Sequence, residues 1–338
     1  LNVFFVLTGI IYLSKTIELF TKKKNAIFFA YIIGLYPPLI RFLPNINSES
    51  IAFMIICALL FHFYKLYQDE RLNWKHLVAA SIYLGFLVLV KIIFLQVMGL
   101  SILILGFLFL FKRNKKVIRA SLVLLNGVLL ISPYLMYAYA ITGKPFYLGT
   151  GGGEILYHRS TPYEDEWGNW FSTEDALYGA NPDYEPSKVY KDLHLLSENH
   201  REFFLKLETL SHLERDSVLK ATAIQNIKKH PGKYLKNTAS NIGRLLFHYP
   251  FSYRQQNLNA YGYMIPNMFI LGLWILSLYP FFLMRRNTPF ELKAVIIFYL
   301  IYAGAIILLD GRGRNFIIVV PSLVLFFSYI YSNPVNIT

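Results

Sequence analysis

A small set of charged residues stands inside or at the edges of long apolar runs, where polar groups are costly and tend to mark functional sites. They are Arg41 and Glu49 in "RFLPNINSES", Lys91 in "LVLVKIIF", and Asp310, Arg312 and Arg314 in "LLDGRGRNF". Arginine offers a bidentate fork to a phosphate and lysine a point charge, while a carboxylate can activate or orient a hydroxyl. Together these residue types suit a phosphate or pyrophosphate whose tail lies in a bilayer.

For each residue alone, a simpler structural interpretation is also open. Asn47 can cap the helix that follows it, and Glu49 in the first turn of that helix suits the helix dipole. Arg41 and Lys91 can extend their charged ends to lipid headgroups. Neither interpretation excludes a shared site.

The "DGRGR" segment has the same two interpretations. Arg312 and Arg314 can pair with Asp310 in a turn that the neighbouring glycines permit. The predicted topology, however, brings all of these charged residues to one face of the membrane. This common position favours a single cavity with phosphate-binding cations.

The composition indicates an integral membrane protein. The chain has 338 residues, of which 55% are hydrophobic and 16% charged, with a mean hydropathy of +0.41. Soluble domains are about 25% charged. The net charge of +13 comes largely from basic residues at the ends of apolar runs, which indicates topology and contact with anionic lipid rather than nucleic acid. Cys57 is the single cysteine, so no disulfide framework is expected.

The expected fold is an all-α polytopic membrane protein with about nine transmembrane helices, each needing about 20 mostly apolar residues. The predicted spans are 1–20, 26–43, 50–67, 77–93, 95–111, 118–140, 264–284, 292–309 and 315–332. Lys91 near the middle of 77–111 favours two short spans there over one long helix.

Lysine and arginine predict the orientation, because they are enriched in cytoplasmic loops. The short loops at 22–24, 65–75, 112–119 and 285–293 are rich in basic residues. The short loops that alternate with them hold few. We therefore expect residue 1 outside, the C-terminus in the cytoplasm, and the protein in the cell membrane.

This topology divides the chain into three parts: 1–141 with about six spans, an extracytoplasmic loop domain at 142–263, and 264–338 with about three spans. Near the end of the loop domain, apolar residues recur at helical spacing, and Pro231 breaks or kinks the helix. A basic opposite face favours either a helix lying on the outer leaflet or one packed on its own domain. That face holds Lys220, Lys228, Lys229, Lys233, Lys236 and Arg244.

The sequence contains few residue patterns typical of metal or cofactor binding. The histidines and Cys57 show no zinc-ligand spacing, and no nucleotide-binding loop of the GxxxxGK type is present. His158 lies near the acidic stretch 164–166, whose carboxylates can bind a divalent cation or simply form a solvated loop. We expect no cofactor and no structural metal, and leave a divalent cation open.

Four stretches resemble a known family in their order and membrane sidedness: "GLYPPLIRFLPNINSES", "LLISPYLMYAYAITGKPFYLGTGGG", "AIQNIKKHPGKYLKN" and "GRGRNFIIVVPSLVLF". From about Phe28 to the end, the chain resembles the GT-C fold glycosyltransferases. Within these it is similar to the bacterial relatives of the dolichyl-phosphate-mannose–protein mannosyltransferases, which include aminoarabinose and Rgt-type sugar transferases.

The resemblance implies transfer of a sugar from a polyprenyl-phosphate carrier to a glycan, lipid or protein acceptor on the outer face, with inversion. It also implies a general base in the first outer loop, which would precede Leu1, so the chain apparently lacks its N-terminal part. Glu49 matches a family glutamate at the start of a span and receives a supporting role. Lys91 stands where the family has the arginine of an "L-x-R-P" pattern, without the proline.

Our site hypothesis gives phosphate-binding roles to Lys91, Arg312, Arg314 and Arg41. The catalytic base stays unassigned. The alternative is a flippase or polymerase of lipid-linked polysaccharide, and a third class is a non-enzymatic assembly or receptor protein. Transporters usually show internal repeats and discontinuous helices, which we do not find, and the third class leaves the outer-face cations without a role.

Overall fold

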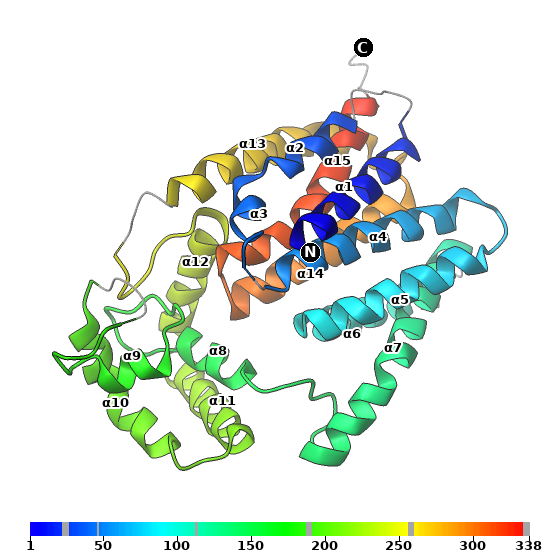
Figure 1. Ribbon diagram of the computed structural model, residues 1–338. Coiled ribbons are helices and arrows are strands. Elements are labelled where there is room, and N and C mark those ends of the chain that lie inside the picture. Colours follow the sequence, from blue (N-terminus) through cyan, green and yellow to red (C-terminus); the bar gives the residue numbers. More distant parts are fainter. Residues whose placement is uncertain (22–26, 46, 112–113, 187–190, 256–259, 334–338) are drawn as a thin grey trace. The chain divides into compact units, whose positions relative to one another are not determined.

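In a computed structural model of the chain, the regular elements of the described part are all helices (Figure 1). The structure describes residues 1–338 except 22–26, 46, 112–113, 187–190, 256–259 and 334–338. The basic residues Lys22–Lys24 and Lys112–Arg113, used to predict orientation, therefore lie outside the described residues. The contacts divide the chain into a first unit (Leu1–Leu148, Ile265–Ala305, Arg314–Thr338) and a second unit (Gly149–Met264, Ile306–Gly313).

The first unit contains most of the apolar helices. Up to residue 142 these are α1 Asn2–Glu18, α2 Phe28–Gly34, α3 Pro37–Arg41, α4 Glu49–Gln68, α5 Trp74–Val90, α6 Ile93–Phe111 and α7 Lys115–Thr142. The later elements are α13 Tyr261–Met284, α14 Phe290–Leu309, η3 Gly313–Ile318 and α15 Val320–Ser332. The ends of α13, α14 and η3 that precede Ile265 or fall within Ile306–Gly313 belong to the second unit.

Of the described helices, 5 are long and apolar enough to cross a membrane: α4, α6, α7, α13 and α14. They fall on the predicted spans 50–67, 95–111, 118–140, 264–284 and 292–309. The other predicted spans fall on shorter helices. α1 and α5 have 17 residues each and α15 has 13. In α13, side chains such as Phe269, Ile275 and Leu276 are exposed, as expected of a helix that faces lipid.

The predicted single span at 26–43 is wrong in its continuity, because the helix is broken into α2 and α3. The break is at Tyr36, which is extended (ψ 111°), and α3 begins with Pro37. A proline has no N–H for the preceding turn and drives the residue before it out of the helical region. The result is one helix of 7 residues and one of 5.

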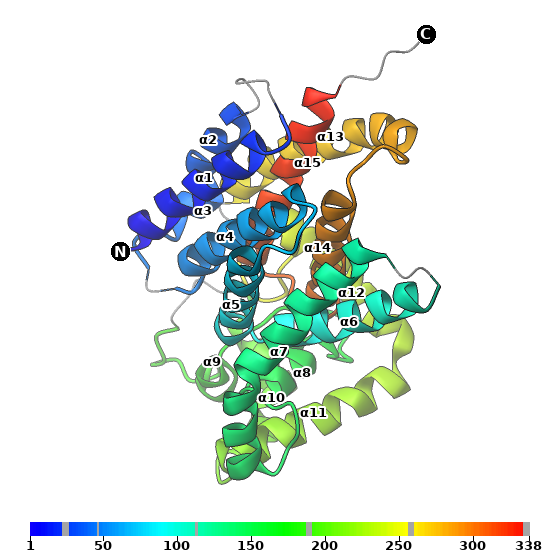
Figure 2. The same ribbon diagram turned by 90° about the vertical axis from the view of Figure 1, so that its right-hand side faces the viewer.

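Helices α1, α4, α5 and α7 pack in succession, and both views show α1 beside α4 and α4 beside α5 (Figures 1 and 2). A glycine allows α1 and α4 to approach each other closely. A Cβ on Gly9 of α1 would lie 2.7 Å from the Phe53 ring of α4. Small residues allow such helix contacts inside membranes. These helix contacts hold α4 in place, and with it Glu49 at its start.

The second unit is built from α8 Gly152–Arg159, α9 Thr173–Tyr178, α10 Leu193–Leu207, α11 His212–Lys229 and α12 Pro231–Phe247. Its core includes Tyr157, Phe171, Phe204, Leu219 and Tyr253. The glycine-rich stretch "GTGGGE" begins α8. There Asp216 Oδ1 accepts the backbone N–H groups of Gly151 and Gly153, each at 2.8 Å.

The predicted break at Pro231 is confirmed, since α11 ends at Lys229 and α12 begins at the proline. The predicted basic face is wrong at two positions. Lys233 Nζ is buried and donates to the carbonyl oxygens of Glu166 (2.7 Å) and Glu164 (3.2 Å). Arg244 is also buried and donates from Nη1 to the Pro250 carbonyl at 2.9 Å.

The other four predicted cations of that face, Lys220, Lys228, Lys229 and Lys236, are exposed. Among the apolar residues of α12, Leu235 is 66% exposed and Ile242 41% exposed. The helix therefore buries some of its long basic side chains and exposes part of its apolar surface. A helix on the outer leaflet would expose such apolar side chains, whereas neither interpretation predicted the burial of Lys233 and Arg244.

Candidate functional site: a buried carboxylate with two cations

The carboxylate of Glu49 lies at the centre of a charged cluster in the first unit. Its side chain is 1% exposed. Lys91 Nζ donates to Glu49 Oε1 at 2.8 Å, and Arg314 Nε lies 3.5 Å from the same oxygen. The structure thus joins three of the residues that the sequence analysis selected.

Each member stands at the end or beginning of a helix. Glu49 is the first residue of α4, and Lys91 immediately follows α5, where its N–H donates to the Leu87 carbonyl at 2.8 Å. Arg314 is the second residue of η3. Three separate chain segments therefore bring their charges to one place.

Two aromatic residues support this arrangement, and the sequence analysis did not identify them. Phe94 donates its N–H to the Lys91 carbonyl at 2.9 Å, and its ring stacks on Tyr302 with centroids 4.7 Å apart. The Tyr302 hydroxyl donates to the carbonyl of Asn315, next to Arg314, at 3.3 Å. A phenylalanine three residues after a lysine is too weak a signal to reveal such a link.

The start of α4 differs from the simpler interpretation of this segment. Ser48, not Asn47, is the N-cap residue, and its side chain makes no capping hydrogen bond. Asn47 therefore does not cap the helix as predicted. Glu49 stands in the first turn, where the helix dipole favours a negative charge. Its carboxylate is engaged by side-chain cations from other segments.

The three charged side chains of the cluster differ in their exposure to solvent. Glu49 is 1% exposed, Lys91 14% and Arg314 30%, so the carboxylate is buried and the cations reach toward the surface. One carboxylate and two cations leave one positive charge in excess. Glu49 Oε2 is buried without a hydrogen-bond partner among the described residues. Such a group costs free energy and calls for a specific reason.

Arg41 and Arg312, the other two cations predicted for the site, are not among the ion-pair partners of Glu49 described above. Arg41 ends α3 and its side chain is exposed. Arg312 belongs to the second unit, where its Nε lies 2.8 and 2.7 Å from the two carboxylate oxygens of Asp310. For Arg312, the pairing with Asp310 considered above is confirmed. For Arg314 that pairing is not what the structure has, because its ion pair is with Glu49.

The second unit contains a separate buried polar cluster around Glu166. Its Oε1 accepts from Asn199 Nδ2 at 2.8 Å and lies 2.9 Å from His200 Nε2. The other ring nitrogen of His200 is 3.0 Å from the Tyr157 hydroxyl. Burial raises the pKa of Glu166, but the hydrogen bond and charge of His200 outweigh this, so the net pKa is lowered. The cluster holds α8, α10 and the segment before α9 together.

Of the two interpretations of the acidic stretch 164–166, the solvated loop fits its first two residues. Glu164 and Asp165 are exposed, while Glu166 is buried. His158 Nε2 instead lies 3.6 Å from Glu154 Oε1, beyond hydrogen-bond distance. Within the described ranges, no three His, Cys, Asp or Glu side chains gather to hold a metal ion.

These features define a class: a helical protein with apolar helices long enough to cross a membrane and a buried carboxylate that holds two cations. No family model matches the chain, and no curated protein or solved structure matches it. The function is therefore inferred from the residues themselves.

The buried pair predicts a strong energetic coupling. Removing one partner of a buried ion pair costs about 3–5 kcal/mol, because the other charge is left without compensation. We expect Glu49→Gln to lower the free energy of unfolding by that order. Lys91→Met should cost less, because Arg314 Nε still lies 3.5 Å from Glu49 Oε1, and the double variant should lose less than the sum of the two. A double-mutant cycle by unfolding in micelles measures the coupling.

The matched control is the exposed pair Glu202–Lys206, whose charged atoms are 2.9 Å apart. Its coupling should stay below about 0.5 kcal/mol. Equal couplings for the two pairs would contradict the buried role of Glu49.

His158 predicts a pH dependence of the second unit. The ring is buried, and burial lowers its pKa below the ordinary value of about 6.5, so it is neutral in the fold. The unfolded chain takes up a proton as the pH falls below about 6.5, so it binds more protons than the folded chain. The free energy of unfolding therefore decreases as the pH is lowered, by up to about 1.4 kcal/mol per pH unit.

Unfolding between about pH 7.5 and 5.5, followed by tryptophan fluorescence, measures this slope. His158→Gln should flatten it, and the exposed His194→Gln should leave it unchanged. Glu166 does not contribute to the slope in this pH range. Its pKa is lowered in the fold, so the stability that it adds is lost only below about pH 4. An unchanged slope in His158→Gln would rule out His158 as the source.

Proposed function

We propose that this chain is the membrane-embedded body of an inverting glycosyltransferase. It takes a sugar from a polyprenyl-phosphate carrier and transfers it to a glycan, lipid or protein acceptor on the extracytoplasmic face. The observation that carries this proposal is the Glu49 carboxylate between Lys91 and Arg314. The same unit contains long apolar helices that can hold the carrier lipid.

The chemistry follows from the charges. A prenyl-phosphate sugar carries its own leaving group, and negative charge collects on the phosphate as the sugar departs. Preorganised cations in a site of low dielectric stabilise that charge without reorganising. Lys91 and Arg314 are the more exposed members of the cluster and supply this stabilisation. Glu49 is a positioning residue that holds both cations in place before the carrier binds.

In this proposal the chain crosses the cell membrane about nine times, with the loop domain at 142–263 outside and the C-terminus in the cytoplasm. The long apolar helices support membrane insertion. The start of α4 and the end of α5 then belong to the outer face, where the phosphate of the carrier would lie. Arg41 and Arg312 stay predictions as further phosphate ligands.

Carrier binding tests the proposal with the 338-residue chain itself. We expect a short-chain polyprenyl phosphate to bind to the purified protein in phosphatidylcholine nanodiscs. Lys91→Ala and Arg314→Ala should each weaken binding about 10- to 100-fold, as expected for a lost hydrogen bond to a charged group. Lys75→Ala, which removes an exposed lysine of α5, should not. The corresponding prenyl alcohol should bind weakly to all four proteins.

Lys91→Arg and Arg314→Lys keep the charge and should retain most of the binding, which separates phosphate recognition from misfolding. Equal binding of the phosphate by the wild type and both alanine variants would exclude the assignment. In proteoliposomes, movement of a labelled prenyl-phosphate sugar between leaflets without release of prenyl phosphate would instead assign a flippase.

A further inference from the structure

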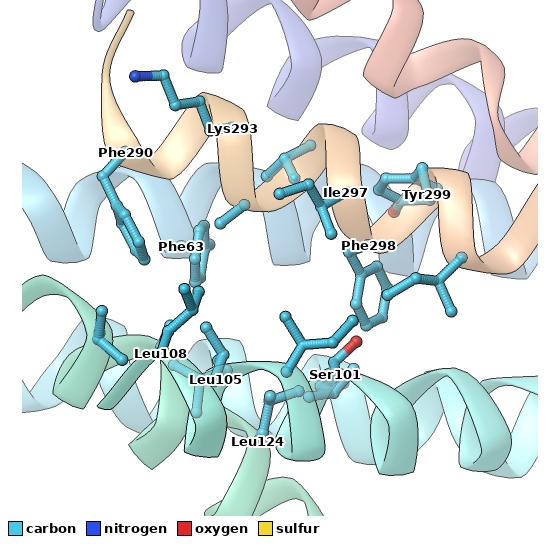
Figure 3. Close-up of a pocket in the computed structure, with 18 of the residues that line it drawn as sticks. Phe63, Ser101, Leu105, Leu108, Leu124, Phe290, Lys293, Ile297, Phe298 and Tyr299 are labelled. Atoms are coloured by element: carbon cyan, nitrogen blue, oxygen red, sulfur yellow. The ribbon is translucent and has the colours of Figure 1, made fainter. Parts of the chain in front are cut away.

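A cavity of about 350 Å³ lies between α4, α6, α7 and α14 of the first unit (Figure 3). Its walls are mainly apolar, with Leu105 and Leu108 of α6, Leu124 of α7 and Phe298 of α14 among them. An apolar cavity of about 150 Å³ is large enough to hold benzene. This one is more than twice as large, and its apolar lining suits a segment of a flexible hydrocarbon chain.

One basic residue stands at one end of the cavity. Figure 3 shows Lys293 and Phe290 there, with the lysine ammonium directed away from the apolar lining, and Ser101 with Tyr299 toward the other end. The Phe290 ring lies 5.8 Å from the ring of Tyr67, whose hydroxyl donates to the Lys116 carbonyl at 2.8 Å. The first turn of α7, which begins with Lys115 and Lys116, therefore stands at the Lys293 end.

The Lys293 end of the cavity is remote from the Glu49 cluster, while its other end includes Phe298, whose ring stacks on Phe94 with centroids 5.8 Å apart. On α4 its lining begins at Leu59, ten residues after Glu49, which is about 15 Å along the helix axis. On α6 the lining begins at Ser101, ten residues after Lys91 in the chain, in a helix that starts at Ile93. The cavity thus extends toward the ends of these helices that are remote from the cluster.

We propose that this cavity binds one acyl chain of an anionic phospholipid, with the headgroup phosphate beside Lys293. The apolar walls match the chain, and the basic end matches the headgroup. Basic pockets between transmembrane helices on the cytoplasmic side bind anionic headgroups in this way. The predicted orientation puts Lys293 on that side. The site is additional to the carrier site, since its charged end is remote from Glu49.

A photoactivatable probe tests this directly. The probe is phosphatidylglycerol with a diazirine in its acyl chain, added to the full chain in phosphatidylcholine nanodiscs. We expect crosslinks to peptides of α6 and α14, and competition by unlabelled phosphatidylglycerol but not by additional phosphatidylcholine.

Two matched pairs of variants make the test specific. Leu105→Trp fills the cavity and should abolish these crosslinks, whereas Leu103→Trp changes a side chain of the same helix that is 70% exposed and should not. Lys293→Ala should lower the preference for phosphatidylglycerol over phosphatidylcholine about fivefold, as expected for one basic group beside an anionic headgroup. Lys75→Ala should leave it unchanged. If Leu105→Trp does not fold, the comparison of Lys293→Ala with Lys75→Ala still decides the test.

Three results would overturn the inference: equal crosslinking in Leu105→Trp and Leu103→Trp, an unchanged lipid preference in Lys293→Ala, or displacement of the probe by a polyprenyl phosphate but not by phosphatidylglycerol. The last would assign the cavity to the carrier. Lys91→Ala, which should weaken carrier binding, should leave phosphatidylglycerol crosslinking intact, so failure of one site is distinguishable from failure of the other.

Discussion

The burial of the Glu49 carboxylate is the constraint on which the first unit depends. A carboxylate that is 1% exposed stays ionised only with cations or hydrogen-bond donors close by, because removing a charge from water costs several kcal/mol. Lys91 and Arg314 meet this need from two distant parts of the chain. The start of α4, the end of α5 and the turn at η3 must therefore converge. The aromatic stack of Phe94 on Tyr302 links two of these segments.

Much of the fold could be predicted from local signals. Hydropathy located the five long apolar helices, and Pro231 marked the boundary between α11 and α12. Pro37 carried a similar signal, but the apolar composition of 26–43 concealed the break. The burial of Lys233 and Arg244 could not be predicted from periodicity. Their long side chains reach backbone carbonyls contributed by other segments, and those positions are fixed only by the tertiary fold.

Glu49, Lys91 and Arg314, three of the five residues proposed for the site, lie together, but the sequence did not predict how they pair. Glu49, Lys91 and Arg314 stood out because charge is rare within apolar sequence. Proximity along the chain favoured Asp310 as the partner of both Arg312 and Arg314, and this holds only for Arg312. The choice depends on the approach of α4 to η3, which no local pattern encodes. The first unit also contains a mainly apolar cavity with Lys293 at one end, which differs in kind from the buried carboxylate between cations.

The central claim is that Glu49 holds Lys91 and Arg314 ready for a phosphate. Solid-state NMR can test this by measuring dipolar dephasing between ³¹P of a bound polyprenyl phosphate and ¹⁵N at Lys91 Nζ and the Arg314 guanidinium, in bilayers of a sulfonated, phosphorus-free lipid. The account predicts dephasing at both sites with the strength of a direct ion pair. It also predicts loss of this dephasing in Glu49→Ala, while Nζ of the exposed Lys75 should show no dephasing in either protein and serves as the internal comparison. Absence of dephasing at Lys91 and Arg314 while the phosphate is bound would contradict it.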